Sequence, residues 1–95
     1  MPSGKEGNWI NSKTMELFFT YILYSEKLDK YYVGSTSDIE RRLAEHNRGK
    51  GTFTKLGMPW KLVYQEEYPT KQQAVAREME IKKRKSKEYI KSLLP

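Results

Sequence analysis

The stretch FTYILYSEKLDKYYVG, residues 19–34, sets the pattern for the whole chain. Both of its ends are rich in aromatic and β-branched residues, which strands favour, while its polar middle is typical of a turn. Pairing Tyr21 with Tyr32 predicts an antiparallel hairpin whose connection covers residues 25–28, a common hairpin length. Because side chains alternate between the two faces of a strand, both phenols are expected on one face of the sheet, together with Gly34.

A helix is predicted directly after this hairpin. Ser37 or Asp38 can cap its amino end, and apolar residues recur four positions apart until the helix ends near Asn47. Residues 48–59 carry glycines, threonines and lysines, a composition typical of a basic surface loop.

The carboxyl-terminal half predicts one more strand and two more helices. The strand covers residues 60–64, the next helix covers 71–85, and a short helix capped by Ser86 ends near Leu94. The order strand, strand, helix, strand, helix, helix favours an α+β domain with a small, mainly antiparallel sheet.

Length and composition narrow the class of protein. The chain has 95 residues, no cysteine and a net charge of +6. One domain with a modest core fits this length, and we interpret residues 1–14 as a flexible leader before a domain over 15–95. The basic surplus favours a polyanionic partner. No segment has the apolar length of a membrane span, and the lack of cysteine is typical of a cytoplasmic protein.

Helical periodicity separates charged neighbours that look alike in the sequence. At about 100° per residue, Arg42 borders the apolar stripe of the first helix, whereas Arg41 lies on the far side and faces water. In the second helix, Glu78 shares the face of Ala74 and Ile81.

A carboxylate on an apolar face needs a partner, because burying an unpaired charge is costly. One interpretation is structural, with Glu78 in a salt bridge to Arg42 or accepting a hydrogen bond from a tyrosine. The other is a metal site, since Mg²⁺ is often held by one or two carboxylates, waters and substrate phosphates.

The other candidates also have structural alternatives. Tyrosines on strands commonly pack in a core, and a single histidine at a helix edge is commonly a polar residue with a partner rather than a metal ligand. The basic run over residues 82–87 is typical of a solvated helix end, and it could equally contact phosphates or serve as a localisation signal.

Taken together, four motifs resemble the GIY-YIG nuclease family, and within it the small single-domain bacterial branch. They are Thr20-Tyr21, then Tyr32-Val33-Gly34-Ser35-Thr36, then Asp38 to Leu43 with His46-Asn47, and finally Arg77-Glu78. The resemblance begins near residue 17 and continues to the carboxyl end. It implies a three-stranded antiparallel sheet flanked by about three helices. The first motif lacks the glycine and isoleucine of the family name but keeps the tyrosine, and the late asparagine of some members is absent after Glu78.

The resemblance also implies a role for each site residue. Tyr32 corresponds to the general base and Tyr21 to its partner in orienting water. Arg42 corresponds to the cation that stabilises the transition state, and His46 is an auxiliary residue. Glu78 corresponds to the ligand of a single divalent ion, Mg²⁺ or Mn²⁺.

The expected function is therefore metal-dependent hydrolysis of phosphodiester bonds in DNA, in repair or recombination, by a monomer or weak dimer. Six basic residues are expected to contact the nucleic-acid backbone without reading bases. They are Lys50, Lys55, Lys82, Lys83, Arg84 and Lys85. Binding is then structure-dependent or weakly sequence-specific, and RNA stays open as a substrate. The alternatives are a nucleic-acid-binding module with little or no cleavage, which acts alone or with a partner protein, and a pure interaction domain whose Glu78 pairs with Arg42.

Overall fold

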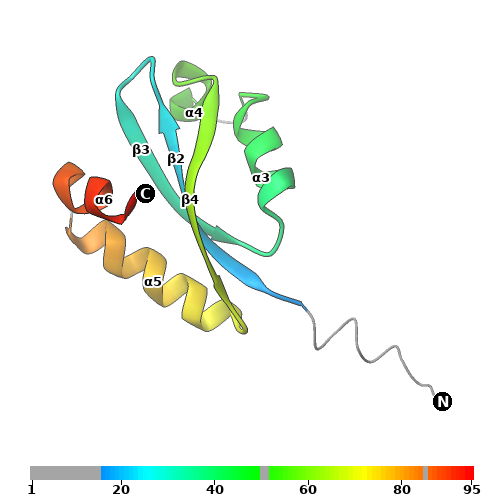
Figure 1. The fold of residues 1–95 in the computed structure, drawn as a ribbon. Coiled ribbons are helices and arrows are strands. Elements are labelled where there is room, and N and C mark those ends of the chain that lie inside the picture. The colour runs from blue at the N-terminus through cyan, green and yellow to red at the C-terminus, as the bar shows by residue number, and fades with distance from the viewer. Residues whose placement is uncertain (1–15, 50–51, 85) are drawn as a thin grey trace.

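The computed structural model describes residues 16–49, 52–84 and 86–95, and within them the chain forms a three-stranded antiparallel sheet with flanking helices (Figure 1). The strand order is β3-β2-β4, so the first strand is central. The elements are β2 (Phe18–Ser25), β3 (Lys30–Thr36), α3 (Ile39–His46), α4 (Thr52–Leu56), β4 (Trp60–Tyr68), α5 (Lys71–Arg84) and α6 (Lys87–Leu93). The expected α+β class and three-stranded sheet are confirmed. The leader predicted over 1–14 lies outside the described residues.

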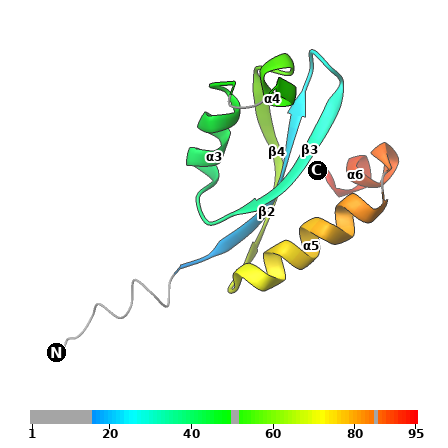
Figure 2. The same ribbon diagram turned by 180° about the vertical axis from the view of Figure 1, so that it is seen from behind.

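The helices divide between the two faces of the sheet. Helices α3 and α4 lie on one side and α5 and α6 on the other, as the two opposite views show (Figure 1, Figure 2). Each face has its own apolar core, one around Tyr21, Leu23 and Trp60 and the other around Ile22, Val33 and Ile81. This division follows from strand alternation, because neighbouring residues of β2 point to opposite faces.

The hairpin has the expected turn length but a different register. Tyr21 pairs with Gly34 and Leu23 with Tyr32, so the turn covers residues 26–29 rather than 25–28. The lack of a side chain at position 34 explains why this register is preferred. A Cβ there would lie 2.5 Å from the Tyr21 hydroxyl oxygen, so only glycine leaves room for the ring. A shift of two residues preserves the face of every side chain, and both phenols therefore share one face as predicted.

Two predictions about the middle of the chain are wrong. The segment predicted as a loop over 48–59 contains the short helix α4, and the strand predicted over 60–64 continues to Tyr68. Trp60 explains the first difference, because its buried indole donates a hydrogen bond to the Thr54 carbonyl and holds α4 against the sheet. The second arises because β4 pairs with β2 as far as the Phe18–Tyr68 pair.

The predicted helices after the hairpin and at the carboxyl end are confirmed. Asp38 caps α3 by accepting a hydrogen bond from the Arg41 amide, and Ser86 caps α6 in the same way through the Tyr89 amide. Gly49 follows α3 with a φ of 71°, the left-handed conformation that favours glycine after a helix. None of the helices in the described part of the chain is long and apolar enough to cross a bilayer.

Candidate active site

Tyr21 and Tyr32 form the centre of the candidate site on the α3 face of the sheet. Their rings are neighbours, with centroids 6.5 Å apart, although they sit on adjacent strands and are not paired directly. Tyr21 is completely buried and lies over Gly34, whereas Tyr32 is partly exposed. The sheet therefore leaves one tyrosine partly exposed and encloses the other behind it.

The buried phenol of Tyr21 has no hydrogen-bond partner among the described residues. Burial raises its pKa, and the Arg42 guanidinium acts in the opposite direction, because it lies within hydrogen-bonding reach of the phenol although the two groups are not well aligned. The charges of Tyr32 and Glu78 also reach this phenol and raise its pKa further, so Arg42, Tyr32 and Glu78 all lie within electrostatic range of Tyr21. At neutral pH Tyr21 therefore keeps its proton and can donate a hydrogen bond to a ligand.

Helix α3 brings Arg42 to this face, as its helical position predicts. Its side chain is 37% exposed, compared with 57% for Arg41. The Nη1 atom of Arg42 lies 3.6 Å from a Glu45 carboxylate oxygen, while its buried Nε has no hydrogen-bond partner in the described part of the chain. A charged guanidinium with a buried donor to spare is suited to bind an anion.

His46 is the last residue of α3 and packs edge-on against Tyr32, with ring centroids 4.4 Å apart. Only 6% of the residue is exposed, and Nδ1 has no hydrogen-bond partner among the described residues. Burial lowers the pKa of His46, and the positive charge of Arg42 lowers it further. The imidazole is therefore neutral near pH 7, and its ring fixes the orientation of the Tyr32 side chain.

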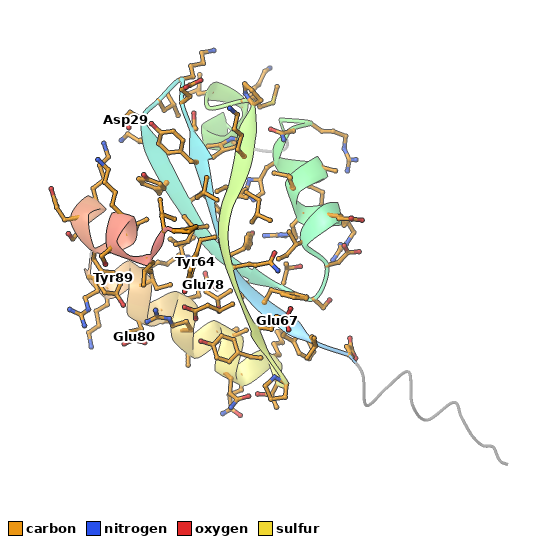
Figure 3. The ribbon with its side chains drawn as sticks, in the orientation of Figure 1. Asp29, Tyr64, Glu67, Glu78, Glu80 and Tyr89 are labelled. Carbon is orange, nitrogen blue, oxygen red and sulfur yellow. The ribbon has the colours of Figure 1, made fainter. Side chains whose placement is uncertain are left out.

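Glu78 projects from α5, on the opposite side of the sheet from α3 (Figure 3), and its carboxylate bonds to Ser35 of the edge strand β3. Its side chain is 16% exposed, compared with 56% for Glu80, as the helical position predicts. The Ser35 hydroxyl donates a 2.7 Å hydrogen bond to one carboxylate oxygen, and the Lys82 ammonium donates a 2.6 Å bond to the other. The predicted structural alternative, a salt bridge to Arg42, is wrong because these two groups are the partners of Glu78.

The residues present are compatible with a single divalent ion. No cluster of three metal-ligating side chains occurs within residues 16–49, 52–84 and 86–95, and Glu78 is the carboxylate that α5 presents at this edge of the sheet. Mg²⁺ is commonly held by one or two carboxylates, with water and substrate phosphates completing the shell. Partial burial and the hydrogen bond from Ser35 hold the Glu78 carboxylate in one orientation for such an ion.

The basic residues expected to bind nucleic acid differ from one another in exposure and pairing. Lys55, Lys83 and Arg84 are exposed, and the Arg84 guanidinium lies 4.6 Å from the centre of the Tyr89 ring. Lys82 is exposed but pairs with Glu78, and Lys50 and Lys85 lie outside the described residues.

The structure adds two contributors to the site that sequence reasoning did not assign. Ser35 positions Glu78; it follows Gly34 directly, so strand alternation could have placed it on the α5 face. The Asn47 side chain accepts a hydrogen bond from the Trp60 amide and donates one to its carbonyl, which ties the end of α3 to β4. An asparagine at a helix end was the only sequence signal for this contact.

A second polar cluster lies between β4 and α5, away from the tyrosine pair. Glu66 accepts hydrogen bonds from the Tyr64 and Tyr68 hydroxyls and from two nitrogens of Arg77. Arg77 also donates to Glu80 and to the Tyr89 hydroxyl. Arg77 and Glu66 are 17% and 20% exposed, and their pairing joins α5 to the sheet.

Comparisons with known proteins agree with this arrangement. Residues 17–91 match the GIY-YIG catalytic domain. A UPF0213 protein of Staphylococcus epidermidis is 44% identical over 69 residues, which cover 72% of this chain and 83% of the relative, and a UPF0213 protein of Staphylococcus saprophyticus gives the same values. The solution NMR structure of a UPF0213 protein from Bacillus halodurans is 35% identical, with a TM-score of 0.50, and the match covers 81% of this chain and 84% of that one. The names of these relatives specify no reaction.

Proposed function

Because this chain belongs to the GIY-YIG family, we propose that it is a metal-dependent endonuclease that hydrolyses phosphodiester bonds in DNA. One observation carries the proposal: around Tyr32 gather three buried polar atoms that lack a well-aligned hydrogen-bond partner within residues 16–49, 52–84 and 86–95. They are the Tyr21 hydroxyl, the Arg42 Nε and the His46 Nδ1. Native proteins satisfy nearly all buried polar atoms, so such a group is expected where a ligand completes the hydrogen bonding.

The two phenols divide the handling of water between them. Tyr32 is partly exposed, so it can reach a water molecule and act as general base. Tyr21 keeps its proton because burial raises its pKa, and its hydroxyl donates a hydrogen bond that orients the water or a phosphate oxygen. His46 holds the Tyr32 ring by an edge-on contact and acts as the auxiliary residue of the site.

Two groups, one from each face of the sheet, stabilise the negative charge that develops on the phosphate. Arg42 donates from α3 to a phosphate oxygen that gains charge in the transition state, through an Nε that has no hydrogen bond to the described residues. Glu78 presents its carboxylate from α5 as the ligand of Mg²⁺ or Mn²⁺. When bound, the ion supplies Lewis-acid stabilisation of the phosphate and the leaving oxygen.

Substrate binding rests on charge rather than base recognition in this proposal. The chain has a net charge of +6. Three exposed basic side chains can contact phosphates, namely Lys55, Lys83 and Arg84. Each such contact releases counterions, so affinity should fall steeply with added salt. The binding is therefore structure-dependent or weakly sequence-specific, in a protein expected to act in the cytoplasm as a monomer or weak dimer.

The test is a gel assay of wild type and Glu78→Gln on labelled duplex, forked, single-stranded and RNA substrates, with Mg²⁺, Mn²⁺ or a chelator. Metal-dependent cutting by the wild type that disappears in Glu78→Gln supports the proposal and identifies the preferred substrate. Glu80→Gln is the matched control, since it removes a carboxylate from the exposed side of the same helix. Binding without cutting by any of the three proteins would contradict the proposal and favour a nucleic-acid-binding module.

A further inference from the structure

The Glu78 carboxylate forms an ion pair with a cationic side chain of the protein itself, Lys82. Lys82 lies one helical turn after Glu78 in α5, and its Nζ is 2.6 Å from Oε2. Ser35 donates to Oε1, so both carboxylate oxygens have a partner. Ser35 is a neutral donor and can remain when a metal ion binds. Lys82 carries a positive charge, and a divalent ion on the same oxygen would repel it.

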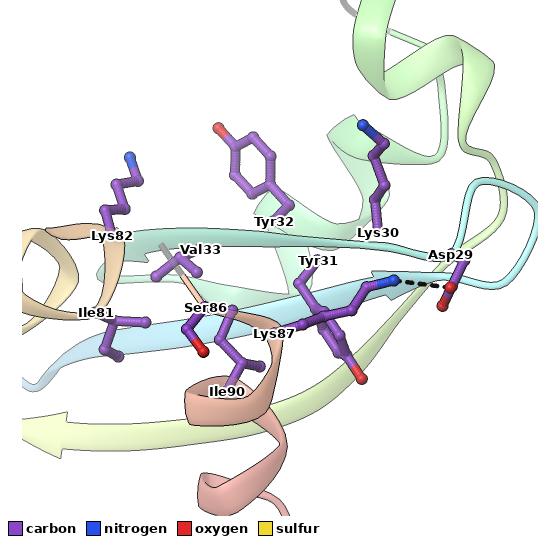
Figure 4. A pocket seen from close by; sticks show the side chains of 10 residues that line it. All are labelled: Asp29, Lys30, Tyr31, Tyr32, Val33, Ile81, Lys82, Ser86, Lys87 and Ile90. Atoms are coloured by element: carbon purple, nitrogen blue, oxygen red, sulfur yellow. Dashed lines mark hydrogen bonds and ion pairs between the residues drawn. The ribbon is translucent and has the colours of Figure 1, made fainter. Parts of the chain in front are cut away.

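The Lys82 ammonium has a second possible position, in a groove that the Lys82 side chain lines. The groove has a volume of about 520 Å³ and lies beside the free edge of β3, where Val33, Ile81 and Ile90 supply apolar contacts. Figure 4 shows the side chains of Lys82, Tyr32 and Lys30 projecting to the same side of β3. The lysine side chain is 49% exposed and its stem is flexible, so its ammonium can turn from the carboxylate into this groove.

The groove favours an anion next to the general base. Lys30 and Lys82 lie on either side of Tyr32 and project to the same side of β3 as its phenol, which in the proposed mechanism faces the water and the scissile phosphate (Figure 4). A lysine ammonium is a compact point charge with three donors and is well suited to a phosphate oxygen. The third lysine of the groove, Lys87, donates to Asp29 and stays engaged at the hairpin turn.

We propose that Lys82 is a shared cation: it neutralises Glu78 before the metal binds and then transfers to a phosphate of the substrate. This inference rests on the proposed metal site at Glu78. It makes metal binding and substrate binding mutually reinforcing, because each ligand favours the same position of Lys82. Such coupling is reciprocal by thermodynamic linkage.

The first measurement is Mn²⁺ affinity by titration calorimetry for wild type, Lys82→Met and Lys83→Met. Lys83 is the matched control, because it is the next residue of α5, is also exposed, and its replacement removes the same charge. Removing the competing ammonium is expected to tighten Mn²⁺ binding about 3- to 10-fold in Lys82→Met, the size expected for one partly exposed ion pair and one nearby charge. Lys83→Met should stay within about twofold of the wild type.

The second measurement separates the two positions of the lysine. Oligonucleotide affinity is measured with Mn²⁺ and with chelator in a Tyr32→Phe background, which keeps the strand uncut. Lys82→Met should weaken binding about 3- to 10-fold with Mn²⁺ and much less with chelator, where Glu78 holds the lysine. Lys83→Met should weaken binding equally in both conditions.

Equal Mn²⁺ affinities for Lys82→Met and Lys83→Met would overturn the shared-cation inference. So would a loss of oligonucleotide binding in Lys82→Met that does not depend on Mn²⁺. If the wild type binds Mn²⁺ and Glu78→Gln does not, the proposed metal site stands whatever Lys82 does. If Mn²⁺ binds none of the proteins in a way that depends on Glu78, the proposed metal site and the shared cation both fail.

Discussion

The two polar clusters of this protein differ in how completely their hydrogen-bonding groups are matched. Between β4 and α5, the Glu66 carboxylate and the Arg77 guanidinium bond to each other, and their other partners are three tyrosine hydroxyls and Glu80. On the α3 face, Tyr21, Arg42 and His46 each keep one buried polar atom without a hydrogen bond among the described residues. Both clusters are built from the same residue types, namely tyrosines and an arginine with carboxylates nearby.

We interpret the difference as that between a structural network and the proposed binding site. A satisfied buried network stabilises the fold and gains nothing from a ligand, whereas an unsatisfied one is costly until a ligand supplies the missing bonds. The β4–α5 cluster should therefore respond to substitution through stability, and the α3-face cluster through activity. Substitutions that reverse this pattern would break the comparison.

The largest expected effect concerns two neighbouring tyrosines that point to opposite faces. Tyr32→Phe should lower cleavage about 10²- to 10⁴-fold, the range for loss of a general base, with little change in folding. Tyr31 packs against the Ile22 and Val33 core on the other face, so Tyr31→Phe should leave the rate per folded molecule within a few-fold. Single-turnover rates on the preferred substrate provide the measurement. Similar losses in both variants would remove Tyr32 from its assigned role.

The next effect tests the satisfied cluster. Glu66→Gln leaves the half-buried Arg77 without its main counter-charge, and we expect the free energy of unfolding to fall by about 1–3 kcal/mol. Urea denaturation followed by circular dichroism measures this change, and the cleavage rate of the folded protein should be nearly unaffected.

Tyr21→Phe is the matched control for this prediction. It removes a buried hydroxyl that has no well-aligned hydrogen bond in the described part of the chain, so stability should stay the same or increase slightly while cleavage falls. A stability loss as large as that of Glu66→Gln would mean that the Tyr21 hydroxyl is bonded within the fold and is not kept for a ligand.

The smallest effect is a pH dependence that originates at His46. Burial lowers the pKa of this histidine from its ordinary value of 6.5, so the unfolded chain binds more protons than the folded protein as the pH falls below that value. Stability is therefore retained above about pH 6.5 and decreases below it. Urea midpoints at pH 7.5 and 5.5 should differ more in the wild type than in His46→Gln. Equal differences in the two proteins would show that His46 titrates as it does in the unfolded chain.

Much of this arrangement was predictable because it depends on local periodicity. Alternation along β2 and β3 placed Tyr21 and Tyr32 on one face, and helical periodicity distinguished Arg42 from Arg41 and Glu78 from Glu80. These assignments need only the geometry of one element at a time. The pairing register was missed because it depends on which side chains fit across two strands, here the Tyr21 ring over Gly34.

Sequence patterns also could not predict which groups pair with the charged side chains. Helical position showed that Glu78 needed a partner, but Ser35 and Lys82 rather than Arg42 supply it. That outcome depends on how α5 lies across the β3 edge, which the Arg77–Glu66 contact helps to fix. Likewise, the short helix α4 arises from the contact of Trp60 with Thr54, and no periodicity within 48–59 indicates it.

Because position 34 lacks a side chain, we expect this residue to mark which related proteins carry the proposed activity. Any other amino acid there would push the Tyr21 ring out of its place, since even a Cβ would come within 2.5 Å of the hydroxyl oxygen. The sheet could survive such a change by a small movement of the ring, but the phenol would no longer face Arg42. Relatives that carry alanine or serine at this position should therefore include proteins that have kept the fold and the basic surface while losing the reaction. The residue at this one position would then distinguish relatives that cleave nucleic acid from relatives that only bind it.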